Sequence, residues 1–163
     1  MPATPKAGAM FDHEKLDVYQ LEVKFISWVT PLLEEMSHSL AGRTREVCDQ
    51  LDRASLSALL NTAEGNGKRQ RQVRAKFFDG ARGSATECAA CLDALVAKKA
   101  ANEERIISGK QMLVRIVSML CGLVDRFDVA NALHEEEFEI QTNCIAQPVS
   151  YSESRTMTRT RKN

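Results

Sequence analysis

QLDRASLSALLNTAEGNGKRQRQVRAKFFDGARGSATE, residues 50–87, is the stretch that decides the fold. It joins the end of one amphipathic segment to the start of another through Gly65-Asn66-Gly67. Glycine readily adopts the left-handed backbone conformation in which many helices end, so two glycines around an asparagine predict a tight reversal. The segment after this reversal is therefore expected to run antiparallel to the segment before it.

Apolar residues recur at steps of three or four on both sides of this turn, which predicts two helices. The first runs from about Thr44 to Glu64, and the second begins near Arg69. The stripe of the first helix consists of Val47, Leu51, Ala54, Ala58 and Asn61. The stripe of the second consists of Phe77, Ala81, Ser84, Cys88, Leu92 and Leu95. Small residues within it, Gly83 among them, predict close approach of a neighbouring backbone.

Two further helical stripes flank this pair. The N-terminal stripe runs from Leu16 to Leu40 through Pro31, which predicts a bend near Ser27 rather than an end, and Ala41-Gly42 then supplies the stop. The C-terminal stripe runs from Ile106 to Phe127, after a polar run at residues 98–104. Each outer segment is therefore expected to be one long helix.

Four such helices with short connections and no alternating strand pattern predict an all-α fold, an antiparallel up-down-up-down four-helix bundle. A chain of 163 residues is long enough for one ordinary domain, which we place at residues 12–130. Residues 1–11 are predicted to be a disordered N-terminus. Residues 131–163 form an extension, first acidic (HEEEFE, 134–139) and then basic, that lacks apolar periodicity and is predicted to be largely disordered.

Whole-chain composition points to no particular partner, because 22 basic and 22 acidic residues leave a formal net charge of zero. The first ten residues lack the apolar core of a secretory signal, and no run reads as a membrane span, so we expect a cytoplasmic protein with no membrane partner. An odd number of cysteines predicts free thiols: Cys48, Cys88, Cys91, Cys121 and Cys144.

Positive charge is nevertheless concentrated locally. Six cations lie within fifteen residues and are opposed there only by Asp79: Lys68, Arg69, Arg71, Arg74, Lys76 and Arg82. Exposed helix faces are often rich in Lys and Arg, which is the simplest interpretation. The alternative is a phosphate-binding face, for which the first five are the candidate nucleic-acid-binding residues. The nearby Phe77 and Phe78 are expected in the core, so binding would be backbone-directed and sensitive to salt.

A polar motif spans the same two helices. Its members on the first helix recur at steps of three or four and share one face: Gln50, Arg53, Ser57, Asn61 and Glu64. The members on the second helix are Arg82, Ser84 and Glu87. Hydrogen bonds and an arginine–carboxylate pair between the two sets would fix the register of the helices. A ligand or subunit contact is the alternative for this motif.

Catalytic and metal chemistry are not supported. The histidines His13, His38 and His134 lie near the ends of elements, away from the serines of the motif, so no nucleophile and base can be paired. Cys88 and Cys91 form a CxxC without a second pair or a nearby histidine, and no Glu/His pairs recur on the apolar faces. We therefore expect no catalytic residue, no metal and no cofactor.

A family resemblance rests on the motifs of the two inner helices. These are Asp49-Gln50-Leu51 with Arg53-Ala54-Ser55, then Ser57, Asn61 and Ala63-Glu64-Gly65, and later Phe77, Ala81-Arg82-Gly83-Ser84 and Glu87. The pattern resembles the four-helix-bundle family of 23S ribosomal RNA intervening-sequence proteins, over roughly Phe11 to Phe127. That family is related to the accessory variability proteins of diversity-generating retroelements, which are strongly basic, whereas this chain is neutral.

The resemblance implies a ring-shaped homo-oligomer, with a pentamer favoured. It also implies a surface that contacts RNA, DNA or a nucleic-acid enzyme such as a reverse transcriptase. The leading hypothesis is therefore a non-enzymatic, homo-oligomeric scaffold whose basic surface meets nucleic acid. The alternative is a structural assembly protein that has a protein partner and binds no nucleic acid.

Overall fold

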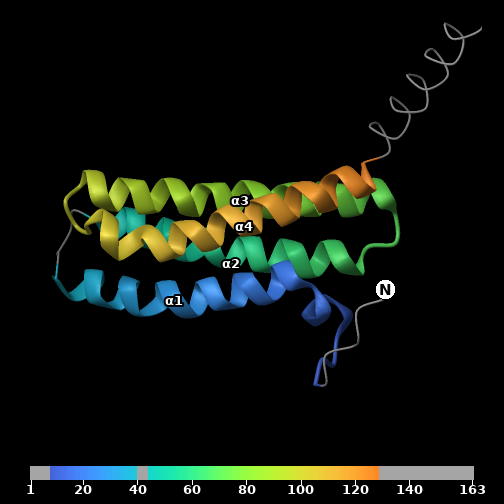
Figure 1. The fold of residues 1–163 in the computed structure, drawn as a ribbon, viewed down its shortest axis with the longest axis horizontal. Coiled ribbons are helices and arrows are strands. Elements are labelled where there is room, and N and C mark those ends of the chain that lie inside the picture. The colour runs from blue at the N-terminus through green and yellow to red at the C-terminus, as the bar shows by residue number, and fades with distance from the viewer. Residues whose placement is uncertain (1–7, 40–43, 129–163) are drawn as a thin grey trace, which may run out of the picture. The chain divides into compact units, whose positions relative to one another are not determined.

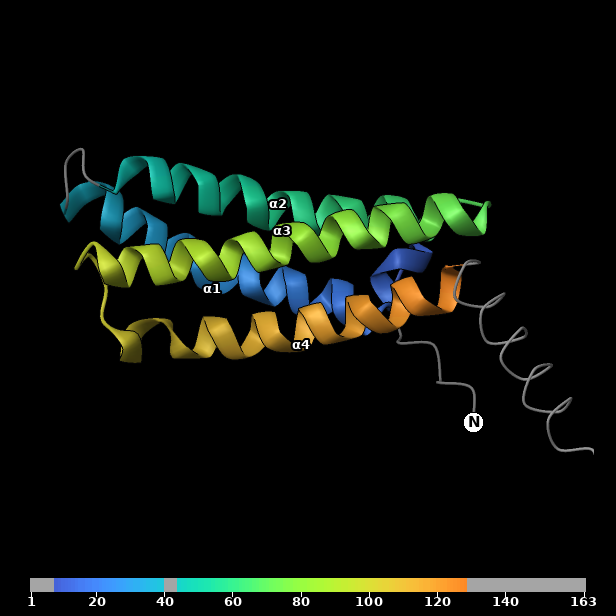
Figure 2. The same cartoon turned by 90° about the horizontal axis from the view of Figure 1, so that it is seen from above.

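Four long helices follow one another in the part of the chain that the computed structural model describes, residues 8–39 and 44–128 (Figure 1). They are α1 (Asp17–Ser39), α2 (Arg45–Gly67), α3 (Arg71–Ala97) and α4 (Glu103–Phe127), preceded by the short 3-10 helix η1 (Asp12–Lys15). Each helix runs antiparallel to the one before it, and α1 also meets α4, which closes the bundle (Figures 1 and 2). The prediction of an all-α antiparallel four-helix bundle is confirmed.

The core consists largely of the predicted apolar stripes, turned inward, although Asn61, Phe77 and Ser84 of those stripes are only half-buried and the prediction of Phe77 in the core was wrong. On α1 the buried residues are spaced by three or four: Val18, Leu21, Phe25, Val29, Leu32 and Met36. They pack in one cluster with residues of the other three helices, such as Leu51, Leu92 and Leu120, each of which is fully buried. Burying one such side chain stabilises the fold by roughly 2 kcal/mol. Extensive apolar burial thus supports the bundle without a disulfide.

Helix α1 continues through Pro31, as its apolar stripe predicted. The hydroxyl groups of Ser27 and Thr30 donate hydrogen bonds to the carbonyl oxygens of Val23 and Ile26, one turn earlier. The predicted stop at residues 41 and 42 lies outside the described residues.

The reversal between α2 and α3 lies later than the sequence predicted. Helix α2 continues through Gly67, and residues 68–70 make the connection. Neither Gly65 nor Gly67 has a positive φ angle. Gly65 serves close packing instead, since a Cβ atom there would lie 3.0 Å from Cβ of Phe77 and 3.1 Å from the ring of Phe78. The prediction of a turn at these glycines was therefore wrong, because an absent side chain can also admit a neighbouring helix.

The connection between α3 and α4 uses a left-handed residue and a helix cap. Lys99 has a φ angle of 59°, and the side-chain oxygen of Asn102 accepts a hydrogen bond of 2.9 Å from the backbone N–H of Arg105. An asparagine at this position satisfies one of the free donors at a helix start. Helix α4 therefore begins at Glu103, three residues before Ile106, the first residue of its predicted apolar stripe.

Glycines and alanines of α3 and α4 have different roles. Ala81 and Ala85 are buried, whereas Gly83 is exposed with nothing within 4 Å of a Cβ atom built on it. The expectation of close packing at Gly83 was wrong, because this residue faces solvent. Gly109 of α4 is the close-contact site: a Cβ atom there would lie 2.2 Å from the indole ring of Trp28.

Several predictions concern other parts of the chain. Residues 1–7 of the predicted N-terminal tail, the extension at 131–163 and Cys144 lie outside the described residues. The remaining cysteines, Cys48, Cys88, Cys91 and Cys121, have free thiols. Helix α4 is long and apolar enough to cross a membrane, by length and composition alone, but core helices of globular proteins share this property.

Candidate functional site

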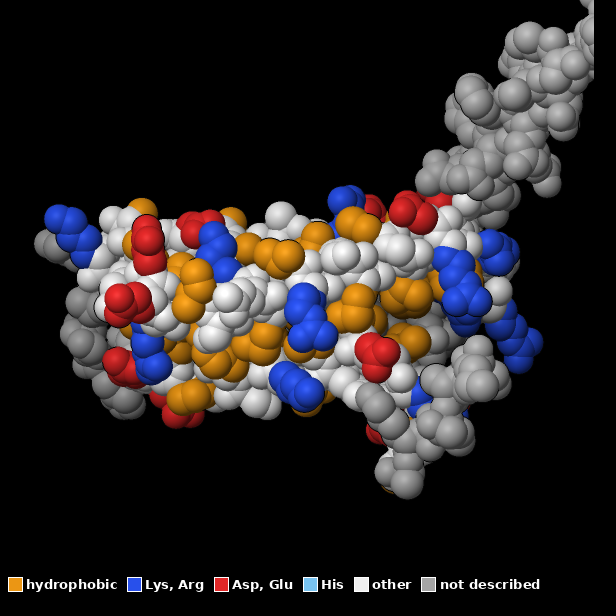
Figure 3. All heavy atoms as spheres, viewed as in Figure 1, with side chains coloured by type: hydrophobic (Ala, Val, Ile, Leu, Met, Phe, Trp, Pro, Cys, Tyr) orange, Lys and Arg blue, Asp and Glu red, His pale blue; other side chains and the backbone are white. Residues whose placement is uncertain are grey.

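The five candidate nucleic-acid-binding residues gather at one end of the bundle. Lys68 and Arg69 lie in the connection between α2 and α3, and Arg71, Arg74 and Lys76 follow in the first turns of α3. Figure 3 shows Lys and Arg side chains clustered at this end of the molecule. The antiparallel fold brings the last turn of α4 to the same place, so Arg126 joins the cluster: the guanidinium group of Arg71 donates a hydrogen bond to its carbonyl oxygen. We call these six residues the basic end.

Phe127 holds three of these cations together. The guanidinium carbons of Arg71, Arg74 and Arg126 lie 5.4, 4.8 and 5.7 Å from the centre of its ring. The centre of the Phe127 ring lies 5.9 Å from the centre of the Phe78 ring, so the two rings pack together. The negative face of an aromatic ring attracts cations, so this arrangement offsets part of their mutual repulsion. A concentrated positive charge is thus maintained at this end.

Members of the basic end differ in how free they are to bind a partner. The ammonium group of Lys68 lies 2.7 Å from the carboxylate of Glu64. Arg74 donates to the carbonyl oxygens of Gly65 and Asn66 at 3.2 and 2.7 Å, at the end of α2, where the Gly65 oxygen also accepts from the backbone N–H of Lys68. Arg69 and Lys76 are exposed and form no ion pair with another described residue. Arg74 is therefore tied to the fold, and Arg69 and Lys76 are the most available cations.

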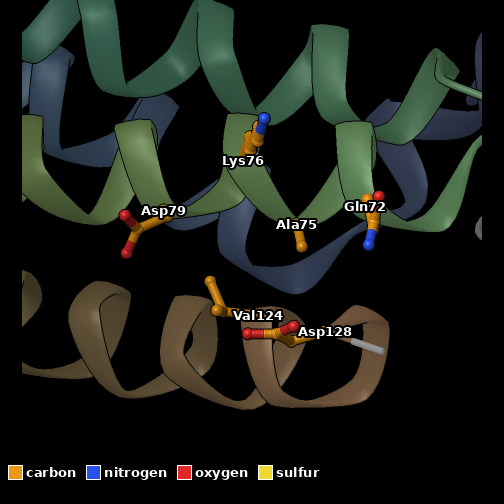
Figure 4. Close-up of a pocket in the computed structure, with 6 residues that line it drawn as sticks. All are labelled: Gln72, Ala75, Lys76, Asp79, Val124 and Asp128. Carbon is orange, nitrogen blue, oxygen red and sulfur yellow. The ribbon is translucent and has the colours of Figure 1, made fainter. Parts of the chain in front are cut away.

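A hollow of about 420 Å³ lies between α3 and α4 beside the basic end. Figure 4 shows Ala75 and Val124 pointing toward each other across it, with Asp79 on the α3 side and Asp128 on the α4 side. Lys76 also lines the hollow, but in Figure 4 its side chain points away from Val124 and Asp128, and the two carboxylates would repel a phosphate group placed here. A phosphate-binding surface is therefore better sought on the end face of the bundle than in this hollow.

Part of the predicted polar motif connects α2 with α3. The hydroxyl groups of Ser57 and Ser84 lie 3.0 Å apart, and the Gln50 amide donates a hydrogen bond to the Glu87 carboxylate. Asn61 donates to the carbonyl oxygen of Ser57 at 2.9 Å. A neutral hydrogen bond of this kind contributes on the order of 1 kcal/mol. These contacts link the two helices in one register.

Other members of the motif form bonds within one helix. Arg53 donates to Gln50 one turn before it, and Arg82 pairs with Asp79 at 2.7 Å. Glu64 pairs with Lys68. The expected arginine–carboxylate pair across the helices is therefore absent among the described residues, because Arg53, Glu64 and Arg82 each find a partner three or four residues away along the chain.

A buried carboxyl group was not predicted from the sequence. The side chain of Glu22 on α1 is only 2% exposed, and its Oε1 accepts a hydrogen bond of 2.8 Å from the Thr62 hydroxyl of α2. Its Oε2 has no hydrogen-bond partner among the described residues. Burial raises the pKa of Glu22 to about 8, so this group is largely protonated at neutral pH. One feature of the sequence could have indicated this burial: Glu22 lies four residues after Val18 and three before Phe25, which places it on the buried face of α1.

The buried thiols are poorly suited to chemistry. Burial raises the pKa of Cys88 to about 12, and it raises the pKa of Cys91 as well. Thiolates rather than thiols act as nucleophiles and metal ligands. Within residues 8–39 and 44–128, no group of three or more His, Cys, Asp or Glu side chains is placed to hold a metal ion. The predicted separation of the histidines from the motif serines concerns His13 among others. The centre of the His13 ring lies 5.6 Å from that of Phe11 and 4.8 Å from that of Tyr19.

Comparison with known proteins gives one informative match. A family model described as 23S rRNA-intervening sequence protein matches residues 14–122, which is more than half of the chain. The matched range begins in η1 and ends in the last two turns of α4, so it covers nearly the whole described bundle. No curated protein matches the chain.

Proposed function

The chain belongs to the family of 23S rRNA-intervening sequence proteins, and on this premise we propose that it is a non-enzymatic scaffold whose basic end binds the phosphate backbone of RNA or DNA. We further propose that it works as a homo-oligomer, with a pentamer favoured, in the cytoplasm. The observation that carries this proposal is the cluster of cations around Phe127.

Electrostatics support phosphate as the ligand. Three guanidinium carbons lie within 6 Å of one ring centre, so no two of them can be more than about 11 Å apart, a distance comparable with the screening length of about 8 Å at physiological salt. Their fields therefore add before salt screens them. A symmetric ring would repeat the basic end once per subunit, which would let one nucleic acid contact several copies. The ring of Phe127 is already covered by arginines and is not free to stack on a base, so we expect the binding to be directed at the phosphate backbone.

An apolar surface on α4 and α1 supports self-association. Ile107 and Val114 are seven residues apart on α4, which places them on one face two turns apart, and they are 55% and 68% exposed. Val23 of α1 is 41% exposed. Figure 3 shows hydrophobic side chains along the face that α1 and α4 form. A subunit contact here would remove this apolar area from water.

Native mass spectrometry of protein purified without nuclease tests assembly and co-purified nucleic acid together. Binding itself is measured by fluorescence anisotropy with a labelled 20-nucleotide RNA at 50 to 200 mM salt. The test variant replaces Lys68, Arg69 and Arg71 with Glu. The matched control makes the same charge change at exposed cations outside the basic end: Lys24, Arg45 and Lys99.

We expect the test variant to lose affinity by roughly tenfold or more and to have a shallower salt dependence than the control. Circular dichroism checks that both variants remain helical. If test and control variants bind equally well, the basic end is not the binding surface.

A second candidate function, an assembly protein with a protein partner, is favoured by Leu56 and Leu60 on α2. These side chains are one turn apart and 50% and 56% exposed. An oligomer that ignores RNA at every salt concentration would support this alternative over the first.

A further inference from the structure

Two large apolar side chains lie exposed just before α1. Met10 is 86% exposed and Phe11 is 60% exposed. Figure 1 shows the segment that carries them, in blue, extending away from the start of α1. Adjacent exposed apolar groups are a feature of protein–protein contacts. We propose that Met10 and Phe11 insert into an apolar hollow between α1 and α4 of a second copy of this chain. This contact would belong to the homo-oligomer of the proposed function, on which the inference rests.

The backbone of residues 10–15, which we call the N-terminal hook, is held in one shape. The Oε2 atom of Glu14 accepts hydrogen bonds from the backbone N–H groups of Met10 and Phe11, at 2.6 and 3.1 Å. These bonds lower the pKa of Glu14, because they stabilise its charged form. The ring of Phe11 is stacked on that of His13, with 5.6 Å between the ring centres. A segment that is already ordered loses less conformational entropy when it binds.

The hollow that would receive the hook lies between the start of α1 and the end of α4 and has a volume of about 270 Å³. An apolar cavity of about 150 Å³ is enough to bind benzene, so this hollow can hold a phenyl ring. Its lining is mostly apolar, with one acid and one base: Leu16, Asp17, Val18, Met119, Gly122, Leu123 and Arg126.

The hook of the same chain does not fill this hollow. Residues 12–15 lie against α1 and α2, whereas the hollow lies between α1 and α4. Among the described residues, Phe11 is not part of the lining. The hook and the hollow are thus on different sides of α1. Each copy can therefore give its hook to one neighbour and receive the hook of another.

Charges on the two surfaces are complementary. With its histidine counted as neutral, the hook carries the acids Asp12 and Glu14 against one base, Lys15, which pairs with Asp12 at 2.7 Å. The hollow has Asp17 and Arg126 in its lining, and Arg126 belongs to the basic end. An acidic hook is therefore attracted toward the basic end beside the hollow, and such attraction fixes the orientation of a contact.

Two variants remove the contact from opposite sides. Met10→Ser with Phe11→Ser removes the apolar groups of the hook. Gly122→Leu fills the hollow, and it should not disturb the helix, because nothing lies within 4 Å of a Cβ atom at this position and leucine favours a helix more than glycine does. The matched control, Leu56→Ser with Leu60→Ser, removes two exposed apolar side chains from α2, away from the hollow.

Sedimentation velocity of the full-length protein, over a range of concentrations at 150 mM salt, measures self-association. We expect the hook variant and Gly122→Leu each to weaken self-association by roughly tenfold or more, and the control to resemble the wild type. Circular dichroism checks that all variants remain helical. Self-association that the two variants leave unchanged, or that the control weakens equally, would overturn the proposal.

A mixture of the two variants tests whether hook and hollow meet each other. The hook variant keeps an intact hollow, and Gly122→Leu keeps an intact hook, so one contact can form between them. We expect the mixture to associate about tenfold more tightly than either variant alone. Native mass spectrometry with one variant ¹⁵N-labelled should show complexes that contain both. A mixture as dissociated as its components would overturn the proposal, because an unrelated interface or a misfolded variant predicts no such rescue.

These measurements separate the failure of the contact from the failure of the proposed function. An oligomer that neither variant weakens would refute the hook contact and leave the proposed homo-oligomer intact. Rescue in the mixture without RNA binding by the wild type would keep the hook contact and refute the nucleic-acid part of the proposed function. A wild-type chain that is monomeric at every concentration would refute both the hook contact and the homo-oligomer.

Discussion

Burial of Glu22 predicts that the bundle becomes less stable as pH rises through neutrality. Within the part of the chain that the structure describes, the carboxyl group accepts a hydrogen bond from Thr62, and its Oε2 atom has no partner. Burial raises its pKa from 4.5 to about 8. Between these two pH values the folded protein keeps a proton that the unfolded chain has released. The contribution of Glu22 to the free energy of unfolding is therefore fully present below pH 4.5. It falls as the pH rises through this window and is lost above about pH 8.

The magnitude follows from the width of the window. Each pH unit within it lowers the free energy of unfolding by about 1.4 kcal/mol. The rise of the pKa to about 8 therefore corresponds to a loss of about 5 kcal/mol across the whole window. This is comparable with the lower end of the total stability of ordinary domains, about 5–15 kcal/mol. The effect of one side chain should thus be measurable.

Urea unfolding followed by circular dichroism, at fixed protein concentration and at pH 5.5, 6.5, 7.5 and 8.5, measures this effect. Glu22→Gln keeps an oxygen that accepts from Thr62 but cannot ionise, so its stability should fall less steeply than that of the wild type. The difference between the two slopes should approach about 1.4 kcal/mol per pH unit between pH 5.5 and 7.5. The control Glu46→Gln, at an exposed position of α2, should follow the wild type. Parallel wild-type and Glu22→Gln curves would refute the reasoning, since Glu22 would then titrate as a solvated group.

Three further predictions follow from packing and burial. Gly109→Ala places a methyl group against Trp28 and should lower the free energy of unfolding by about 2 kcal/mol. Gly83→Ala lies in open space and should raise the free energy of unfolding by up to about 1 kcal/mol. Chemical denaturation measures both variants, and equal effects would contradict the packing argument. Arg74→Ala leaves two carbonyl oxygens at the end of α2 without their side-chain donor and should cost about 1–2 kcal/mol, seen as a lower Tm. The thiol of Cys88, with a pKa of about 12, should react with a disulfide reagent at pH 8 only as fast as the bundle opens, and a fast reaction in the native protein would contradict its burial.

Much of the fold could be predicted because it depends on local patterns. Apolar residues at steps of three or four specified each helix and the side of it that is buried, as at Phe25 and Leu32 of α1. The same reasoning misplaced the α2–α3 reversal, since a glycine signals either a turn or a close contact. Only the position of Phe77 and Phe78 against Gly65 shows that close packing is the role here.

The candidate site was predicted only in part. The cations of residues 68–76 are close in sequence and could be recognised as a group. Arg126 and Phe127 lie about 50 residues further along the chain and join them only in the folded bundle. In the polar motif, Ser57 and Ser84 meet across the helices, whereas Arg82 bonds to Asp79 on its own helix. A list of motif residues cannot distinguish these cases, because a charged side chain has partners both along and across a helix.

The sequence by itself determined the number of helices, their order and the apolar face of each, because these properties follow from the spacing of residues along one helix. The tertiary structure alone decided which charges are shared, as in the arginines around Phe127, and which polar group is deprived of water, as in Glu22. The physical reason is that electrostatic energy and desolvation depend on distance and burial in space. Antiparallel helices bring together residues that are far apart in the chain, and no local pattern encodes that proximity.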